Sequence, residues 1–187
     1  MKRTFTGIFP AIVLPYDDHL NINEPELRSL ARWLASVDGV SGIVCNGHAG
    51  EVASLDRAER KRVVQIVADE VGNKVQVLGA VASENNKEAV ELAEDIAQVG
   101  GAGLLVMPPH SWLRFGRQQG SSEAFFKDVA SVGLPIVVHQ YPAWTKASYS
   151  ADTLLKLERF LAVLHPRDVV RHPAALERGH GQLGAIQ

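Results

Sequence analysis

The chain has a single cysteine, Cys45, among its 187 residues, so an intrachain disulfide is excluded and nothing indicates an oxidising compartment. No apolar run approaches the roughly 18 residues of a membrane-spanning helix. The opening residues 1–7 (MKRTFTG) lack the apolar stretch of a signal peptide. We therefore expect a cytoplasmic protein with no membrane partner.

An excess of charge of either sign is also missing. The formal net charge is −2, which gives no electrostatic reason to expect a nucleic acid or an anionic membrane as partner. The one basic cluster, residues 57–62, is interleaved with Asp56 and Glu59 and is typical of a solvated helix face. The remaining composition, 46% hydrophobic and 21% charged, is that of an ordinary globular domain.

Apolar, β-branched runs alternate with amphipathic stretches along most of the chain. The runs expected to form strands are 7–14, 40–45, 75–81, 103–107 and 135–140. Their starts recur about every 30 residues, the length of one βαβ unit. Several are apolar at nearly every position, which indicates a parallel sheet covered by helices. Periodicity alone fits a doubly wound sheet or a (β/α)₈ barrel, and in both a ligand binds at the carboxyl ends of the strands.

Helix-capping residues stand at the start of the stretches between these runs. The expected N-caps are Asn23, Asp56, Asn85 and Ser150, and the first three are each followed by a glutamate three positions later. This spacing is the capping-box signature. Gly100 and Gly133 stand where helix ends are expected. The α/β pattern thus predicts the positions of helices as well as strands.

The repeating pattern stops near residue 160. We expect an α/β fold of the (β/α)₈ TIM-barrel type, truncated to about five βα units in residues 1–160, because a complete barrel needs eight units and about 250 residues. Residues 161–187 form an atypical tail rich in histidine and arginine. The tail is either a natural, unusual or disordered segment or the result of an interrupted gene, read in a shifted frame or running to an early stop. We favour the interrupted gene because pattern and composition change at one place.

A motif that indicates a function follows the second expected strand. Residues 45–51 read CNGHAGE and residues 54–60 read SLDRAER. This resembles the G-T-T-G-E loop and S-L-x-x-x-E-R helix start of the dihydrodipicolinate synthase/N-acetylneuraminate lyase family. Three further segments are similar to the family's first, fourth and fifth strands: PAIVLPY (10–16), GLLVMPP (103–109) and PIVVHQYP (135–142). The resemblance extends from residue 5 to about residue 160.

The resemblance implies a class I aldolase or lyase built on a (β/α)₈ barrel, commonly a homo-oligomer, with no cofactor. Such enzymes bind pyruvate or a similar 2-oxo acid as an imine on a lysine of the sixth strand. The imine nitrogen acts as an electron sink for the carbanion at the neighbouring carbon. The loop after the second strand holds the substrate carboxylate, since a glycine-rich turn lets backbone N–H groups approach an anion. A tyrosine on the fifth strand relays protons.

Carried over to this chain, the carboxylate-binding triplet is Gly47, His48 and Ala49, without the two threonine hydroxyls of the family. The position of the family tyrosine holds His139, and the nearest tyrosine is Tyr141. Either side chain could relay protons, because imidazole titrates close to neutrality and a phenol carries an exchangeable proton. We expect only one of the two to point inward if the strand is regular.

The position of the imine-forming lysine holds Arg167. Arginine stays protonated and cannot act as the amine nucleophile, so this chain is not expected to complete the family's reaction alone. Lys146, in the loop after the fifth expected strand, is the only lysine that could reach the pocket in its place. Trp144 stands where relatives that bind a dicarboxylic product often have arginine, which leaves the second substrate open.

Two alternatives remain open at this point. The chain could be a metal-dependent lyase, in which His48, His110 and His139 bind Zn²⁺ to stabilise an enolate. It could also be a non-catalytic remnant or a partner subunit that docks on a full-length relative, because a partial barrel leaves strand edges unpaired.

Overall fold

The computed structural model describes residues 5–158 of the chain. In chain order the elements are α1 (Glu24–Ala35), β1 (Gly42–Cys45), the short 3₁₀ turns η1 (His48–Gly50) and η2 (Val52–Ser54), α2 (Arg57–Val71), β2 (Gln76–Val81), α3 (Asn86–Gln98), β3 (Gly103–Val106), α4 (His110–Phe115), α5 (Ser121–Ala130), β4 (Ile136–Val138) and α6 (Ala151–Leu157). The predicted tail 161–187 and Arg167 lie outside the described residues. None of the helices in the described part is long and apolar enough to cross a membrane.

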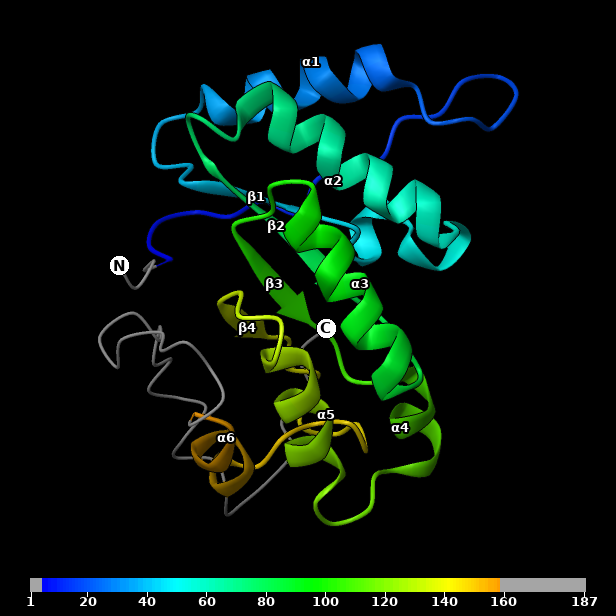
Figure 1. Cartoon of the computed structure of the whole chain (residues 1–187), viewed down its shortest axis with the longest axis vertical. Helices are drawn as coiled ribbons and strands as arrows, with labels where there is room; N and C mark the ends of the chain where they lie inside the picture. Colours follow the sequence, from blue (N-terminus) through cyan, green and yellow to red (C-terminus); the bar gives the residue numbers. More distant parts are fainter. Residues whose placement is uncertain (1–4, 159–187) are drawn as a thin grey trace, which may run out of the picture.

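The four strands form one parallel sheet in the order β1-β2-β3-β4, so each successive strand adds to the same edge (Figure 1). The expected α/β fold with a parallel sheet is confirmed. Residues 7–14 run parallel to β1 through two isolated bridges, Ile8 with Val40 and Ala11 with Val44. The prediction of a regular strand here is wrong, because Pro10 has no N–H to donate to a ladder.

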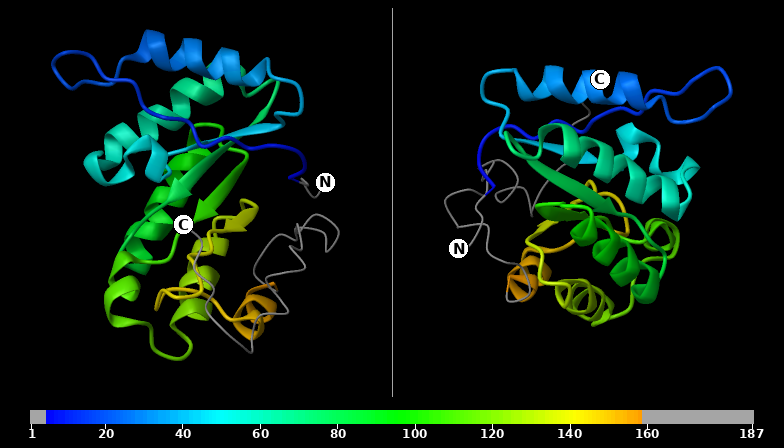
Figure 2. Two further views of the ribbon diagram at one scale, coloured as in Figure 1. Left: turned by 180° about the vertical axis from the view of Figure 1, so that it is seen from behind. Right: turned by 45° about the horizontal axis from the view of Figure 1, so that its top comes forward.

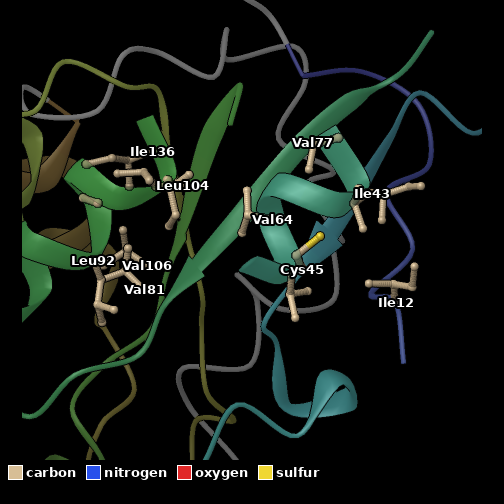
Figure 3. Close-up of a cluster of buried hydrophobic side chains, with 14 of the residues drawn as sticks. Ile12, Ile43, Cys45, Val64, Val77, Val81, Leu92, Leu104, Val106 and Ile136 are labelled. Carbon is tan, nitrogen blue, oxygen red and sulfur yellow. The ribbon is translucent and has the colours of Figure 1, made fainter. Parts of the chain in front are cut away.

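One face of the sheet is covered by helices. Helices α2, α3 and α5 lie in front of the strands in Figure 1, and the reverse view (Figure 2, left) shows the strands in front. Alternate strand residues point into this layer, as the pleat requires. Figure 3 shows these side chains: Ile43, Cys45, Val77, Val81, Leu104, Val106 and Ile136 from the strands, with Val64 and Leu92 from the helices. All of them are at most 4% exposed, so this layer is the main core.

The other face, the open face, carries a smaller apolar cluster. Among the described residues, its members are the intervening strand residues Val44, Leu78, Leu105 and Val137, together with Phe5 and Phe9 from the amino-terminal segment. The two rings lie over glycines: a Cβ atom at Gly42 would overlap Phe9, and one at Gly103 would overlap Phe5. The glycines therefore let aromatic rings lie directly on the sheet, near the amino ends of the strands.

The predicted helix starts are confirmed. The side chains of Asn23, Asp56, Asn85 and Ser150 each accept a hydrogen bond from the backbone N–H three residues later. Only Asp56 forms the full reciprocal capping box, with Glu59. Gly100 and Gly133 adopt positive φ angles of 87° and 84°, which glycine accommodates without strain.

The basic cluster 57–62 lies on a largely solvent-exposed face of α2, as predicted, and it also joins this helix to its neighbours. Arg57 and Lys61 form ion pairs with Asp95 of α3, and Arg62 pairs with Glu24 of α1. Arg60 donates to the carbonyl oxygens of Leu55 and Ala82. These side chains join α2 to its neighbours and to the loops that follow β1 and β2.

Candidate functional site

The loop after β1 turns sharply at the carboxyl edge of the sheet. Asn46 adopts a left-handed conformation (φ 58°) and is buried, and its Nδ2 donates to the carbonyl oxygen of Arg60 over 2.8 Å. Asparagine tolerates this conformation better than most residues. The turn directs the next three residues, Gly47, His48 and Ala49, away from the helix-covered core.

The turn η1 leaves backbone donors available. Its two internal hydrogen bonds run from Gly50 N to Gly47 O (3.0 Å) and from Glu51 N to His48 O (3.1 Å). The N–H groups of His48 and Ala49 therefore have no acceptor within the turn, as at the start of any helical segment. Both residues are exposed. Two adjacent N–H groups of this kind can bind an anion.

These donors border a cavity of about 490 Å³ on the open face of the sheet. Its polar end is formed by Gly47, His48, Ala49 and His139. The rest of the lining is apolar: Phe5, Phe9, Ala11, Val44, Leu78, Leu105, Met107 and Val137. The structure thus brings together four of the five predicted site residues on one cavity, and the fifth, Tyr141, contacts His48.

His48 is the centre of a group of rings. Its Nε2 lies 3.4 Å from Nε2 of His110 and 3.2 Å from the hydroxyl of Tyr141. The ring of His139 meets it edge-on, with centroids 5.8 Å apart. The prediction that only one of His139 and Tyr141 points inward was made for a regular strand, but β4 ends at Val138, before either residue. Both rings lie near His48, and of the two only His139 lines the cavity.

The surroundings set the protonation of the two predicted proton carriers. Burial, and then the nearby His48, lower the pKa of His139, so its imidazole is neutral at neutral pH. Burial, and then the charge of Glu84, raise the pKa of Tyr141, so the phenol keeps its proton. The site therefore combines a neutral imidazole with a protonated hydroxyl, which can accept and donate protons respectively.

Sequence reasoning missed how His110 is held in place. The Glu84 carboxylate accepts hydrogen bonds from the N–H groups of His110 (2.7 Å) and Ser111 (3.0 Å) and so caps α4. Burial raises the pKa of Glu84, but these hydrogen bonds outweigh it and lower the pKa overall. The cap comes from a residue far away in the sequence, so no local motif marked α4, and His110 was expected only as a metal ligand.

The zinc alternative finds no support in residues 5–158, where no group of three or more His, Cys, Asp or Glu side chains is arranged to hold a metal ion. The rings of His48 and His110 are nearly parallel, with centroids 5.7 Å apart and Nε2 atoms only 3.4 Å apart. The two nitrogens therefore face each other along the line between the rings. This geometry fits a hydrogen bond between imidazoles and not two lone pairs converging on one ion.

No lysine among the described residues lines the cavity. Lys146 donates from Nζ to the carbonyl oxygen of Arg114 (3.0 Å) and does not line the cavity. Trp144 is 83% exposed and does not line the cavity either.

Comparison with known proteins shows which family the chain resembles. A profile of the "Dihydrodipicolinate synthetase family" matches residues 4–171. A 4-hydroxy-tetrahydrodipicolinate synthase of Methanopyrus kandleri is 35% identical over 183 residues, covering 97% of this chain and 57% of that protein. One of Natronomonas pharaonis is 36% identical over 155 residues, covering 82% of this chain and 51% of that protein. The chain thus spans about half the length of these relatives.

Solved structures agree. A crystal structure of a dihydrodipicolinate synthase superposes with a TM-score of 0.72 at 30% identity, covering 84% of this chain and 54% of that one. N-acetylneuraminate lyase from Mycoplasma synoviae has the same fold, with a TM-score of 0.73 at 21% identity, covering 85% of this chain and 53% of that one. The parallel α/β arrangement therefore corresponds to about half of a TIM barrel of this kind. The chain belongs to the dihydrodipicolinate synthetase family.

Proposed function

We propose that the chain carries the 2-oxo acid-binding part of a class I (Schiff-base) aldolase or lyase, with pyruvate or a similar acid as substrate. The observation that carries this proposal is the cavity on the open face of the sheet, whose polar end combines the backbone donors of η1 with His139. Family membership supplies the reaction class.

In this proposal the substrate carboxylate binds at Gly47, His48 and Ala49. The N–H groups of His48 and Ala49 are the donors, and Gly47, in extended backbone with φ −77°, keeps the approach free of a side chain. Both donors act through the backbone, so the loss of the family's threonine hydroxyls does not remove them.

Protons are moved by Tyr141 and His139 in this proposal. The Tyr141 hydroxyl contacts Nε2 of His48, next to the carboxylate site. His139 lines the cavity with a neutral imidazole. A protonated phenol can donate to a developing alkoxide, and a neutral imidazole can accept a proton from a carbon acid or water.

Imine formation needs a neutral primary amine, and residues 5–158 place none at the cavity. At the position of the family's lysine the sequence has Arg167. We therefore propose that this chain binds the 2-oxo acid but forms no imine by itself. A partner role is the second candidate, favoured by the partly exposed Phe9, Leu105 and Val137 on the open face. Homo-oligomeric assembly is proposed on family grounds.

Isothermal titration calorimetry with pyruvate tests whether the carboxylate binds at residues 47–49. Ala49→Asp places a carboxylate beside the two N–H groups, and we expect pyruvate affinity to fall at least about tenfold from charge repulsion. Ala53→Asp is the matched control, because Ala53 is also an exposed alanine in the middle of a three-residue 3₁₀ turn and does not line this cavity. Equal affinities for the two variants would contradict the carboxylate site.

Borohydride reduction in the presence of labelled pyruvate tests the imine claim. We expect no covalent adduct with this chain, and an adduct with a relative that contains the sixth-strand lysine run in parallel. Stable label on this chain would show that one of its own lysines forms the imine, and peptide mapping would identify it.

A further inference from the structure

The pair formed by His48 and His110 can take up a proton, which the threonine of the family's loop cannot do. Their Nε2 atoms face each other at 3.4 Å, in rings inclined by only 18°. Two imidazoles in this arrangement share one N–H between two nitrogens. The pair can take up one proton and keep a charge-assisted N–H⁺···N hydrogen bond, whereas a second proton would place like charges in contact.

The pair is connected to the proposed carboxylate site through His48. That residue belongs to η1 and lines the large cavity beside Gly47 and Ala49, while His110 lies behind it at the start of α4. A charge on the pair therefore lies next to the backbone donors of η1. A positive charge on the pair would attract an anion bound at these donors.

The charged and titratable groups around the pair come from five elements. Tyr141 and His139, after β4, face His48, and Glu84, after β2, lies 4.0 Å from Nδ1 of His110. Arg60 of α2 and Glu88 of α3 share a smaller cavity with His110. Glu51 follows η1 directly, three residues after His48. The Glu84 carboxylate, which lies beside His110, attracts a positive charge on the pair.

We propose that the His48–His110 pair makes binding of the 2-oxo acid proton-linked, with one proton taken up as the carboxylate binds. The inference rests on the proposed function, because it concerns the same site. The substrate carboxylate stays ionised throughout the range in which imidazole titrates, so the proton goes to the protein. His48 contributes the charge and His110 is a positioning residue that shares the proton.

Calorimetric titration with pyruvate from about pH 5.5 to about pH 8.5 tests the inference, since this range spans imidazole titration. We expect affinity to weaken as pH rises, by up to about tenfold per pH unit, the limit for one linked proton. Titrations in buffers of different ionisation enthalpy should show uptake approaching one proton. His48→Gln should abolish both effects, and His110→Phe should move the pH dependence to lower pH. His19→Gln, an exposed histidine in the loop before α1, should leave both unchanged.

The outcomes separate the two proposals. No pyruvate binding at any pH overturns the proposed function, and this inference with it. Binding that does not depend on pH overturns the inference alone. A pH dependence that persists in folded His48→Gln assigns the proton to another group, such as His139, and also overturns it. Imidazole C–H resonances of the unaltered chain give a reading that needs no variant: at a fixed pH, pyruvate should move the His48 resonances toward those of a protonated imidazole, and unchanged resonances would contradict the proposal.

Discussion

The two faces of the sheet differ in what covers them and in what they do. On one face, alternate strand residues are sealed beneath α2, α3 and α5 in a continuous apolar layer. On the other, the intervening residues form a small cluster with two aromatic rings of the described chain and border a cavity of about 490 Å³. The same four strands supply both sets, because side chains alternate across a strand.

The helix-covered face contributes most of the stability, and the open face carries the proposed ligand site. Fully buried side chains such as Leu104 contribute about 1.5–3 kcal/mol each by leaving water, and most of these lie on the helix-covered face. Polar residues gather where the strands end, on the open side. Changes in the helix-covered layer should therefore lower the free energy of unfolding, and changes on the open side should alter ligand binding.

Two neighbouring leucines of β3 give the sharpest test and the largest expected effect. Leu104 is fully buried against the helices, and Leu105 is partly buried on the open face. We expect Leu104→Ala to lower the free energy of unfolding by about 3 kcal/mol and Leu105→Ala by about 1 kcal/mol. Urea denaturation followed by circular dichroism measures both. Equal losses would show that the open face is as well packed as the covered one.

Two glycines extend the comparison with a smaller effect. A Cβ atom at Gly79 of β2 would lie 2.5 Å from Cγ1 of Ile96 in α3, whereas one at Gly47 would have Ala11 Cβ, 4.0 Å away, as its nearest neighbour. Gly79→Ala should lower the free energy of unfolding by about 2 kcal/mol through overpacking, and Gly47→Ala should lower it by less than about 0.5 kcal/mol. The same denaturation measurement applies, and a stable Gly79→Ala variant would mean that α3 can move away from the sheet.

The ion pairs between α2 and α3 should give a smaller, pH-dependent effect. Burial raises the pKa of Asp95, but hydrogen bonds from Arg57 and Lys61 outweigh it, so the pKa is lower in the folded chain than in the unfolded one. A lowered carboxyl pKa stabilises the fold above the unfolded pKa, and this stabilisation is lost as pH falls through the folded pKa.

We therefore expect Asp95→Asn to lower the free energy of unfolding by about 1 kcal/mol at neutral pH and by progressively less in acid. Denaturation between about pH 3 and about pH 7 covers the carboxyl range. Asp69→Asn, an exposed position on α2, is the matched control and should change little. If the loss of stability caused by Asp95→Asn did not depend on pH, the ion pairs of Asp95 would not be its cause.

Local signals explain what the sequence could predict. Capping by Asn23, Asp56, Asn85 and Ser150 acts over three residues, so these helix starts could be read directly and are confirmed. The apolar runs for β1 to β4 were found for the same reason, although each strand is shorter than expected. The loop 47–49 could be located because it follows a strand in a recognisable motif.

One failure has a local cause, and the others have causes far away along the chain. The first expected strand is reduced to two bridges, because Pro10 lacks a donor whatever the hydrophobicity of its neighbours. Helix α4 is capped by Glu84, which reaches it from the loop after β2. The meeting of His48 with His110 and Tyr141 depends on three loops converging at one edge of the sheet, which no spacing along the chain reveals.

Backbone amide NMR shifts on titration with pyruvate test most directly the central claim, that ligand chemistry lies on the open side at the carboxyl ends of the strands. The account predicts that the largest shifts occur at Gly47, His48 and Ala49, with smaller ones at His139 and Tyr141 and none in the helix-covered layer. Shifts concentrated in α2, α3 or α5, or no shifts at saturating pyruvate, would contradict it.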